Sequence, residues 1–480
     1  GAAVRRVDLP AIADFQTAMM LSLMPSSLHW YLHISRSWSI KGRHGYQMTG
    51  LDARLIKRYD ELVMGHSNGL PALAAGMKAL PRTDKAFAQT QALWRFLSND
   101  RIKPVDLVKP LLALAHEGCR EGCDDYALVM HDWSRLNYMH HHSKADRLQM
   151  THRGDIGYEL QSSLLVTDRD GAPICTPAQN LATKDGVLST RAEQMLASEK
   201  HLDELTERID WLEQQEFAKP LVHIVDREAD SVAHMRRWQA EGWNWLLRVK
   251  AGSTATYEGQ SQPLSKIGSG LVYTETRKVQ YKGKPATQWV GEASVVLTRK
   301  AQPFLKDRAE RKTLHKAGEP LPARLIISRI MGADGSLLAE WYLLSNLEQQ
   351  VAGEQLALWY YWRWRIESYF KLLKGGGHQL ENWQQESGEA VFKRLLIASQ
   401  ACAVSWRIMR AEGEFAEQTR DFLVRLSGRQ MKRSQPVTAS AVLAGLYMLL
   451  AMCETLEQHT PEELAAFAKE AIGWMASRRT

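Results

Sequence analysis

The stretch Trp359-Tyr-Tyr-Trp-Arg-Trp-Arg-Ile-Glu-Ser-Tyr-Phe-Lys-Leu-Leu-Lys374 is followed directly by three glycines, Gly375 to Gly377. Read with 3.6 residues per turn, it predicts one helix that begins near Glu354 and ends at the glycines. Its apolar side chains fall on one arc, which we expect to be the buried face. They are Leu358, Trp362, Ile366, Tyr369 and Leu373.

Four polar side chains share another, narrow stripe of the same predicted helix. They are Tyr360, Arg363, Glu367 and Lys374, so one carboxylate is flanked by two cations and a phenol. Most stripes of this kind are exposed ion-pair surfaces that contribute little to stability. The same charges would also suit a phosphate-binding surface, and the stripe alone leaves both interpretations open.

Two aspartates follow apolar segments that predict buried strands. Residues 126–130 lead to Asp132, and residues 221–225 lead to Asp226. We expect both aspartates at strand ends, where many folds present their site residues. Together with Glu367 they could hold two hard cations, Mg²⁺ or Mn²⁺, about 3.5–4 Å apart. Such a pair activates a water or hydroxyl and stabilises the leaving oxygen in phosphoryl transfer.

The order of predicted elements gives an α/β fold class. Three strands, a helix and further strands follow one another after residue 126, in the order of a ribonuclease-H-like catalytic core. A β-rich insertion with hairpins at Gly283 and Asp334-Gly335 interrupts this core before the predicted helix that carries Glu367, which we call the glutamate helix. The expected domains are a helical N-terminal domain (1–115), the first part of the core (116–250), the insertion with a basic loop (251–350), the glutamate helix with the following helices (351–430) and a C-terminal helical region (431–480).

The composition is that of an ordinary soluble globular protein, with 45% apolar and 24% charged residues among 480. No apolar run approaches the roughly 18 residues that a membrane span needs, so we expect no membrane association. The five cysteines are sparse and odd in number, which favours a reduced, cytoplasmic compartment.

Positive charge is concentrated in the insertion. The whole chain carries a formal charge of +7, and residues 277–316 alone contain eleven Lys or Arg against three acidic residues. A localised basic excess is typical of a polyanion-binding patch. A solvated, flexible loop is an equally open interpretation.

Two other chemistries fit the sequence less well. His116, Cys119, Cys123 and the run from His140 to His142 could be zinc ligands, but they do not give the paired spacing of a structural zinc site. Paired carboxylates also serve glycosidases. The cations around Glu367 favour phosphate over sugar.

The polar stripe resembles the Tyr-Arg-Glu-Lys signature of the bacterial insertion-sequence-four family of DDE transposases. Its members are separated by two, three and six residues, as in that signature. The segment Asp226-Arg-Glu-Ala-Asp230 is similar to the second-aspartate motif of the same family. The resemblance extends from about residue 80 to about residue 450.

The resemblance implies a role for individual residues. Asp132, Asp226 and Glu367 would be the catalytic, metal-binding triad. Tyr360, Arg363, Lys374 and Arg248 would bind phosphates of the transposon end, and Trp341 would stack on a base flipped out near the cleaved end. Residues 92–96 resemble part of the family's end-recognition domain, so residues 1–115 would recognise the DNA end, and the C-terminal region (431–480) would serve dimerisation. Trp133 and Ser134 stand where a relative has small hydroxyl residues, so Asp124 and Asp125 are alternatives to Asp132.

The resemblance also implies an activity. It is Mg²⁺-dependent cleavage of transposon ends, through a DNA hairpin intermediate, followed by strand transfer into target DNA. The partners would be transposon-end DNA, target DNA and a second copy of the chain in the paired-end complex, in the bacterial cytoplasm at the nucleoid. Two alternatives stay open: a ribonuclease-H-like nuclease without strand transfer, and a non-catalytic DNA-binding protein with a decayed transposase fold.

Overall fold

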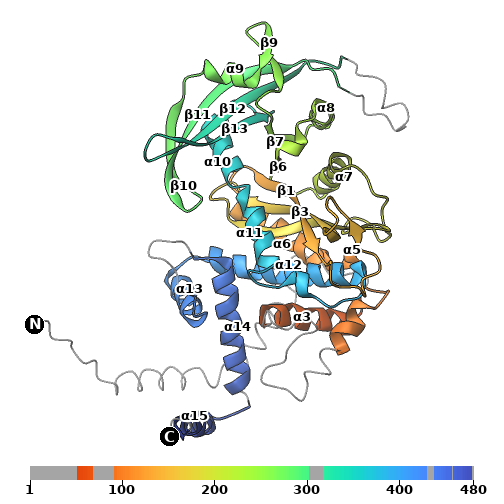
Figure 1. Ribbon diagram of the computed structural model, residues 1–480, viewed down its shortest axis with the longest axis vertical. Coiled ribbons are helices and arrows are strands. Elements are labelled where there is room, and N and C mark those ends of the chain that lie inside the picture. The colour runs from red at the N-terminus through yellow and green to blue at the C-terminus, as the bar shows by residue number, and fades with distance from the viewer. Residues whose placement is uncertain (1–50, 69–90, 302–316, 430–436, 457, 478–480) are drawn as a thin grey trace, which may run out of the picture.

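The computed structural model describes residues 51–68, 91–301, 317–429, 437–456 and 458–477. It is a mixed α/β structure with one large sheet, and this confirms the predicted α/β class (Figure 1). Within the described residues, no helix is both long and apolar enough to cross a membrane.

Six strands form the half of the sheet that carries the predicted aspartates. They are β1 (Ala127–Asn137), β3 (Ile156–Thr167), β4 (Pro173–Thr183), β5 (Gly186–Ser189), β6 (Leu221–Val225) and β7 (Asn244–Val249). Their spatial order is β5-β4-β3-β1-β6-β7, with a short β2 (Leu148–Gln149) paired to β3. The pairs among β3, β4 and β5 and between β1 and β3 are antiparallel, whereas β1, β6 and β7 run parallel. The predicted apolar strand at 221–225 is fully buried, as expected for a parallel strand covered on both faces.

The insertion continues this sheet instead of forming a separate one. Its elements are β8 (Thr254–Tyr257), β9 (Gln260–Pro263), α9 (Leu264–Ser269), β10 (Thr274–Tyr281), β11 (Lys284–Leu297), β12 (Leu321–Gly332) and β13 (Leu337–Ser345). β13 pairs antiparallel with β7, so the complete sheet has 13 strands. Both predicted hairpins are confirmed: Lys282 and Gly283 join β10 to β11 with positive φ, and Gly335 lies in the turn from β12 to β13.

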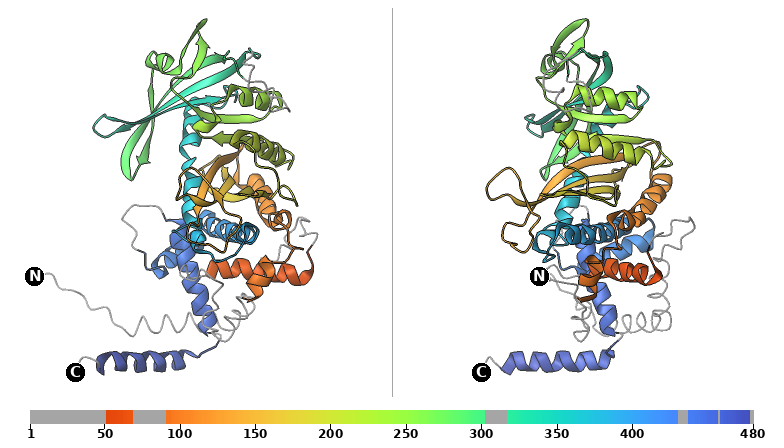
Figure 2. Two further views of the ribbon diagram at one scale, coloured as in Figure 1. Left: turned by 45° about the vertical axis from the view of Figure 1, so that its right-hand side comes forward. Right: turned by 90° about the vertical axis from the view of Figure 1, so that its right-hand side faces the viewer.

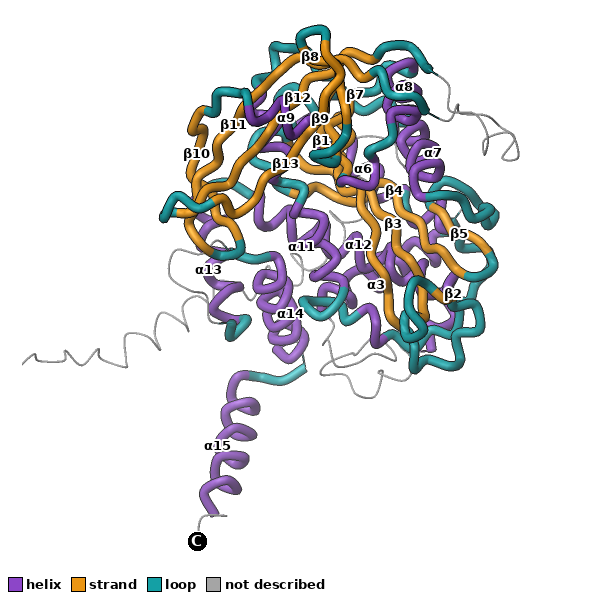
Figure 3. Tube along the Cα trace, turned by 45° about the horizontal axis from the view of Figure 1, so that its top comes forward, coloured by secondary structure: helices purple, strands orange, loops and turns teal. Residues whose placement is uncertain are grey.

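Helices cover the sheet on both faces. They are α3 (Ala53–Asn68), α5 (Pro104–Leu107), α6 (Lys109–Gly122), α7 (His201–Glu213), α8 (Val232–Ala240), α10 (Gly353–Tyr361), α11 (Trp364–Leu373), α12 (Gly388–Arg410), α13 (Glu414–Leu426), α14 (Ala439–Leu456) and α15 (Pro461–Ser477). α6 and α12 pack against β4, and α15 extends away from the body in every view (Figures 1, 2 and 3).

The hydrophobic core divides into two clusters because neighbouring strand residues point to opposite faces. Ile224 and Leu246 join the cluster that contains α6, α11 and α12, whereas Val225 and Leu247 join the cluster that contains α7 and α8. The site residues lie where β1 and β6 emerge between these two cores.

Two of the predicted segments fall partly outside the described residues. Of the basic stretch 277–316, residues 302–316 are not described. Of the N-terminal domain, residues 91–97 form a helix in which Leu93 and Phe96 are buried and Trp94 is exposed.

Candidate active site

Asp132 and Asp226 meet because of the register between two parallel strands. The last paired residues of β1 and β6 are His131 and Val225, so the two aspartates are the next residue on each strand. Asp226 follows the end of β6, as predicted. Asp132 does not end its strand, because β1 continues for five more residues while β3 pairs with it as far as Asn137 and Gly157.

The alternatives to Asp132 lie elsewhere. The backbone N–H groups of Asp124 and Asp125 donate to the Asp168 carboxylate just before β1 begins, and the Asp124 side chain pairs with Arg169. Residue 132, five residues into β1, is therefore the position that the fold brings next to Asp226.

Arg363 joins the two aspartates. Its Nη1 donates to Asp132 Oδ2 at 2.6 Å, and its Nη2 lies 3.2 Å from Asp226 Oδ2. Arg363 is only 7% exposed. Burial opposes its charge, but Tyr360 and the two aspartates raise the pKa of Arg363 above its usual value. The sequence placed Arg363 among DNA phosphates, whereas here its partners are carboxylates.

Three further donors engage Asp226 Oδ1: the Arg227 N–H at 2.6 Å, the Tyr360 Oη at 3.1 Å and the Arg248 Nη1 at 3.3 Å. Although burial works against it, Arg363 and then these three donors lower the pKa of the Asp226 carboxyl. Asp132 behaves differently, since burial outweighs Arg363 and raises its pKa. Tyr360 and Arg248 thus lie at the predicted site, in contact with a carboxylate.

The glutamate helix is broken where a single helix was predicted. α10 ends at Tyr361 and α11 begins at Trp364, with tightened turns in which Arg363 N–H donates to Tyr360 O at 3.0 Å and Arg365 N–H donates to Trp362 O at 2.8 Å. The Trp362 ring packs closely against Gly171, which has a positive φ. Because of the break, Arg363 precedes the helix that carries Glu367 and is not on a continuous stripe with it.

Glu367 lies in the first turn of α11 and is half-buried. Burial, followed by the negative charge of Asp132, raises the pKa of the Glu367 carboxyl, and Asp226 adds to this. Its carboxylate makes no hydrogen bond with any residue that the structure describes. Burial and the two aspartates thus outweigh Arg363 and Lys371, which act to lower the pKa of Glu367.

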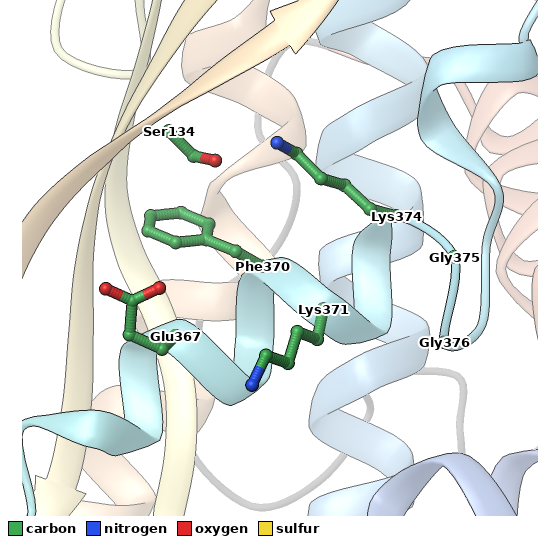
Figure 4. Close-up of a pocket in the computed structure, with 7 residues that line it drawn as sticks. All are labelled: Ser134, Glu367, Phe370, Lys371, Lys374, Gly375 and Gly376. Carbon is green, nitrogen blue, oxygen red and sulfur yellow. The ribbon is translucent and has the colours of Figure 1, made fainter.

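An open pocket lies beside α11 (Figure 4). It is lined by Ser134, Glu367, Phe370, Lys371, Lys374, Gly375 and Gly376. Lys374 Nζ donates to Arg135 O at 2.5 Å and lies 3.5 Å from Glu381 Oε1. The predicted residues Glu367 and Lys374 thus border the same pocket. Lys371 does not belong to the predicted polar stripe. Its position one helical turn after Glu367, on an exposed side of the helix, is the signal that could have identified it.

Trp341 is 7% exposed and lies on β13. Its ring makes an edge contact with Tyr360, at 5.5 Å between centroids, and a tilted contact with Tyr361 at 6.5 Å. The predicted stacking on a DNA base is a matter for experiment. In this arrangement Trp341 supports the tyrosine that donates to Asp226.

Two buried histidines, His131 and His223, form a hydrogen-bonded row next to the aspartates. They were not predicted because both lie within apolar strands. His131 Nε2 lies 2.9 Å from His223 Nδ1, and His223 Nε2 lies 2.9 Å from Glu213 Oε1. The row links β1, β6 and α7 directly before the two aspartates emerge.

The carboxylates as they lie do not fit the expected pair of metal ions. Among the described residues, no group of three or more His, Cys, Asp or Glu is placed to hold a metal ion. The reason is local: Arg363 takes one oxygen of each aspartate, and backbone N–H groups of Trp133 and Arg227 take the others. The same finding gives no support to zinc binding by the described histidines and cysteines, all five of the latter being free thiols.

Residues 194–406 match the family model of the transposase DDE domain. This segment includes Asp226, Glu367 and every predicted DNA-binding residue, but not Asp132. A comparison with curated proteins gives no match. Among solved structures, the cryo-EM structure of a piggyBac transposase synaptic complex with hairpin DNA is similar to 90% of this chain and 79% of that chain, with 10% identity and a TM-score of 0.33.

Proposed function

We propose that this chain is a DNA transposase that cuts transposon ends and joins them to target DNA. The observation that carries the proposal is the overlap between the matched transposase DDE domain and the carboxylate site. The matched segment supplies Asp226 and Glu367, and the pairing of β1 with β6 adds Asp132 beside them. The strand order β5-β4-β3-β1-β6-β7 supports the finer proposal of a ribonuclease-H-like core. The spacing of Tyr360, Arg363, Glu367 and Lys374 supports the finer proposal of the insertion-sequence-four family.

The surroundings of the carboxylates suit a phosphodiester substrate. Lys371 and Lys374 border the open pocket next to Glu367, and their ammonium groups would hold backbone phosphates. Arg248 and Arg363 supply guanidinium groups, which bind phosphate with two parallel hydrogen bonds. A sugar-binding site would have little use for this many cations, so the charge pattern supports DNA.

The expected reaction is in-line displacement at phosphorus, first by water and then by the freed 3′ hydroxyl. We include in the proposal a hairpin intermediate and the use of two Mg²⁺ or Mn²⁺ ions, because the family resemblance implies both. The chain's own contribution is to orient the phosphate and to present three carboxylates of like charge, whose mutual repulsion a divalent cation would relieve.

A strand-transfer assay tests the function. The end sequence is first obtained by selecting bound duplexes from random DNA at two salt concentrations. The chain is then given labelled, pre-cleaved ends and a plasmid target with Mg²⁺. Joined products support a transposase; nicking of uncleaved ends without joining would indicate a nuclease, and binding without either reaction would indicate a non-catalytic protein.

We also propose that the active form is a dimer with two DNA ends, assembled through the C-terminal helices. α15 stands away from the body, and Phe467 on it is 59% exposed. Analytical ultracentrifugation with end DNA should show a complex of two chains and two ends. One chain per end, with no paired complex, would contradict the dimer.

A further inference from the structure

Arg363 occupies the position that a cation would take between the two aspartates. Its guanidinium bridges Asp132 Oδ2 and Asp226 Oδ2 at 2.6 Å and 3.2 Å, and it is buried. The remaining oxygens accept backbone N–H groups at 2.9 Å and 2.6 Å. A hard divalent ion needs several carboxylate oxygens at once, and here both shared oxygens already have a cationic partner.

Electrostatic repulsion opposes binding of Arg363 and of a divalent ion between Asp132 and Asp226 at the same time. The two aspartates bring two negative charges, and Arg363 together with Arg248 brings two positive ones. A divalent ion entering this site would meet a guanidinium within a few ångströms in a partly desolvated setting, where repulsion is screened weakly. Binding of the ion therefore requires Arg363 to leave its carboxylates.

A DNA phosphate is the natural alternative partner for Arg363. Phosphate accepts the same two-pronged hydrogen bonding as a carboxylate. The open pocket bordered by Lys371 and Lys374 is on the helix that begins directly after Arg363, so a DNA backbone held there lies close to the guanidinium. Arg363 itself belongs to the tightened turn between α10 and α11, outside both regular helices.

We propose that Arg363 is a displaceable counter-ion that makes divalent-metal binding depend on bound DNA. Without DNA it ties Asp132 to Asp226 and keeps the ion out. With a phosphate in the pocket it moves to the DNA, and the freed oxygens join Glu367 in binding the ion. The inference rests on the proposed function, since it takes DNA as the ligand.

Coupling of this kind is reciprocal: DNA must strengthen metal binding by the same factor by which the metal strengthens DNA binding. It would also protect the cell, because a chain without its DNA end would carry no assembled metal centre. Repulsion between Asp132, Asp226 and Glu367 is what the incoming ion would relieve once the guanidinium has left.

The test is a Mn²⁺ titration of the full chain, followed by the electron paramagnetic resonance signal of free Mn²⁺, with and without a duplex carrying the selected end. For the unchanged chain we expect DNA to tighten Mn²⁺ binding by about tenfold or more. Arg363→Gln should bind Mn²⁺ about tenfold more tightly than the unchanged chain without DNA, and DNA should add little. No gain from DNA in the unchanged chain would overturn the proposal.

Three controls keep the result interpretable. Lys469→Gln removes an exposed lysine on α15, outside the carboxylate site, and should retain the DNA effect on Mn²⁺. Adding Asp226→Asn to Arg363→Gln should abolish the tight site, which locates it. Arg363→Lys restores one positive charge without the two-pronged bridge and should be intermediate in Mn²⁺ affinity, and it replaces the glutamine variant if that variant fails to fold.

Failure of the proposed function looks different. If the chain selects no DNA, the transposase proposal fails, yet the DNA-free titrations still decide the role of Arg363. Equal or weaker Mn²⁺ binding by folded Arg363→Gln and Arg363→Lys, relative to the unchanged chain, would show that Arg363 does not exclude the ion.

Discussion

The two ends of α11 carry cations that the family signature treats alike but that the fold treats differently. Just before its first residue, Arg363 is buried and bridges two aspartates. At its last turn, Lys371 and Lys374 border an open pocket, and the Lys374 side chain is 26% exposed. The difference teaches that cations of one sequence motif can have different partners, with Arg363 bound to carboxylates and Lys374 at the edge of an open pocket.

The largest expected effect falls on Glu367, which lies between these two ends. Glu367→Ala should reduce strand cleavage by about a thousandfold or more and leave end binding nearly intact, because the proposed role of this carboxylate is to bind the divalent ion and not the DNA. Asp226→Ala should behave in the same way. A denaturing gel of labelled ends measures cleavage, with the exposed Glu354→Ala as the control. Nicking by Glu367→Ala in Mg²⁺ would show the triad assignment to be wrong.

Arg363→Ala probes the buried end through stability. It leaves Asp132 and Asp226 facing each other without their shared partner, and the loss of one member of a buried pair typically costs on the order of 3 kcal/mol. Lys374→Ala, at the open end, should change the free energy of unfolding by less than about 1 kcal/mol. Urea unfolding followed by tryptophan fluorescence gives both values. Similar losses for the two variants would erase the contrast between the ends.

Trp341→Ala tests the surroundings of Arg363, the buried end of the comparison, because Trp341 contacts Tyr360. If Trp341 stacks on a flipped base, hairpin formation should fail by more than the first nick, since only the hairpin step needs a displaced base. A time course on a denaturing gel resolves nicked, hairpin and opened products, and Trp341→Phe retains the aromatic contact with Tyr360 as a control. Equal loss of both steps would assign Trp341 to packing alone.

Lys374→Ala probes the open end through salt dependence. Loss of one phosphate contact should reduce the slope of log affinity against log salt by about one and weaken binding on every sequence alike. Lys469→Ala, an exposed lysine on α15, is the matched control and should leave the slope unchanged. An unaltered slope in Lys374→Ala would remove this lysine from the DNA path.

The smallest effect is a pH dependence of stability at Glu367. The fold raises the pKa of this carboxyl, so its ionised form is disfavoured and the folded state is relatively more stable at low pH. The penalty is present above the folded pKa and disappears as pH falls below the ordinary glutamate value. Glu367→Gln should therefore be slightly more stable than the unchanged chain at pH 7, with the difference closing near pH 4. A gap that widens at low pH would contradict the sign.

Sequence periodicity predicted which residues matter better than it predicted what they touch. Strand 221–225 and its following Asp226 were found because a parallel, doubly covered strand is apolar throughout. Asp132 was found but misplaced at a strand end, because β3 extends β1 beyond the apolar run through pairing that local sequence does not reveal. The break before Trp364 was missed because the sequence on both sides of it has a helical pattern. Trp362, at the break, packs on Gly171, which is almost two hundred positions away in the sequence.

The same limit applies to the contacts of the site. A helical period places Arg363 on a face but does not say that Asp132 and Asp226 will lie opposite that face. The row of histidines next to the aspartates depends on the alignment of β1 with β6, which no single segment specifies. Tertiary pairing, and not propensity, decides these features.

Because the sheet is continuous, the insertion cannot be removed or replaced without disturbing the core. β13 pairs with β7 from Ser345 opposite Leu246 to Tyr342 opposite Val249, and both strands contribute to the same buried clusters. A chimera or deletion that removed the insertion would leave β7 as an unprotected edge, prone to pairing between molecules. Shortened variants should therefore be trimmed from the far side of the sheet, at β8 and β9, while the seam between β13 and β7 is kept whole.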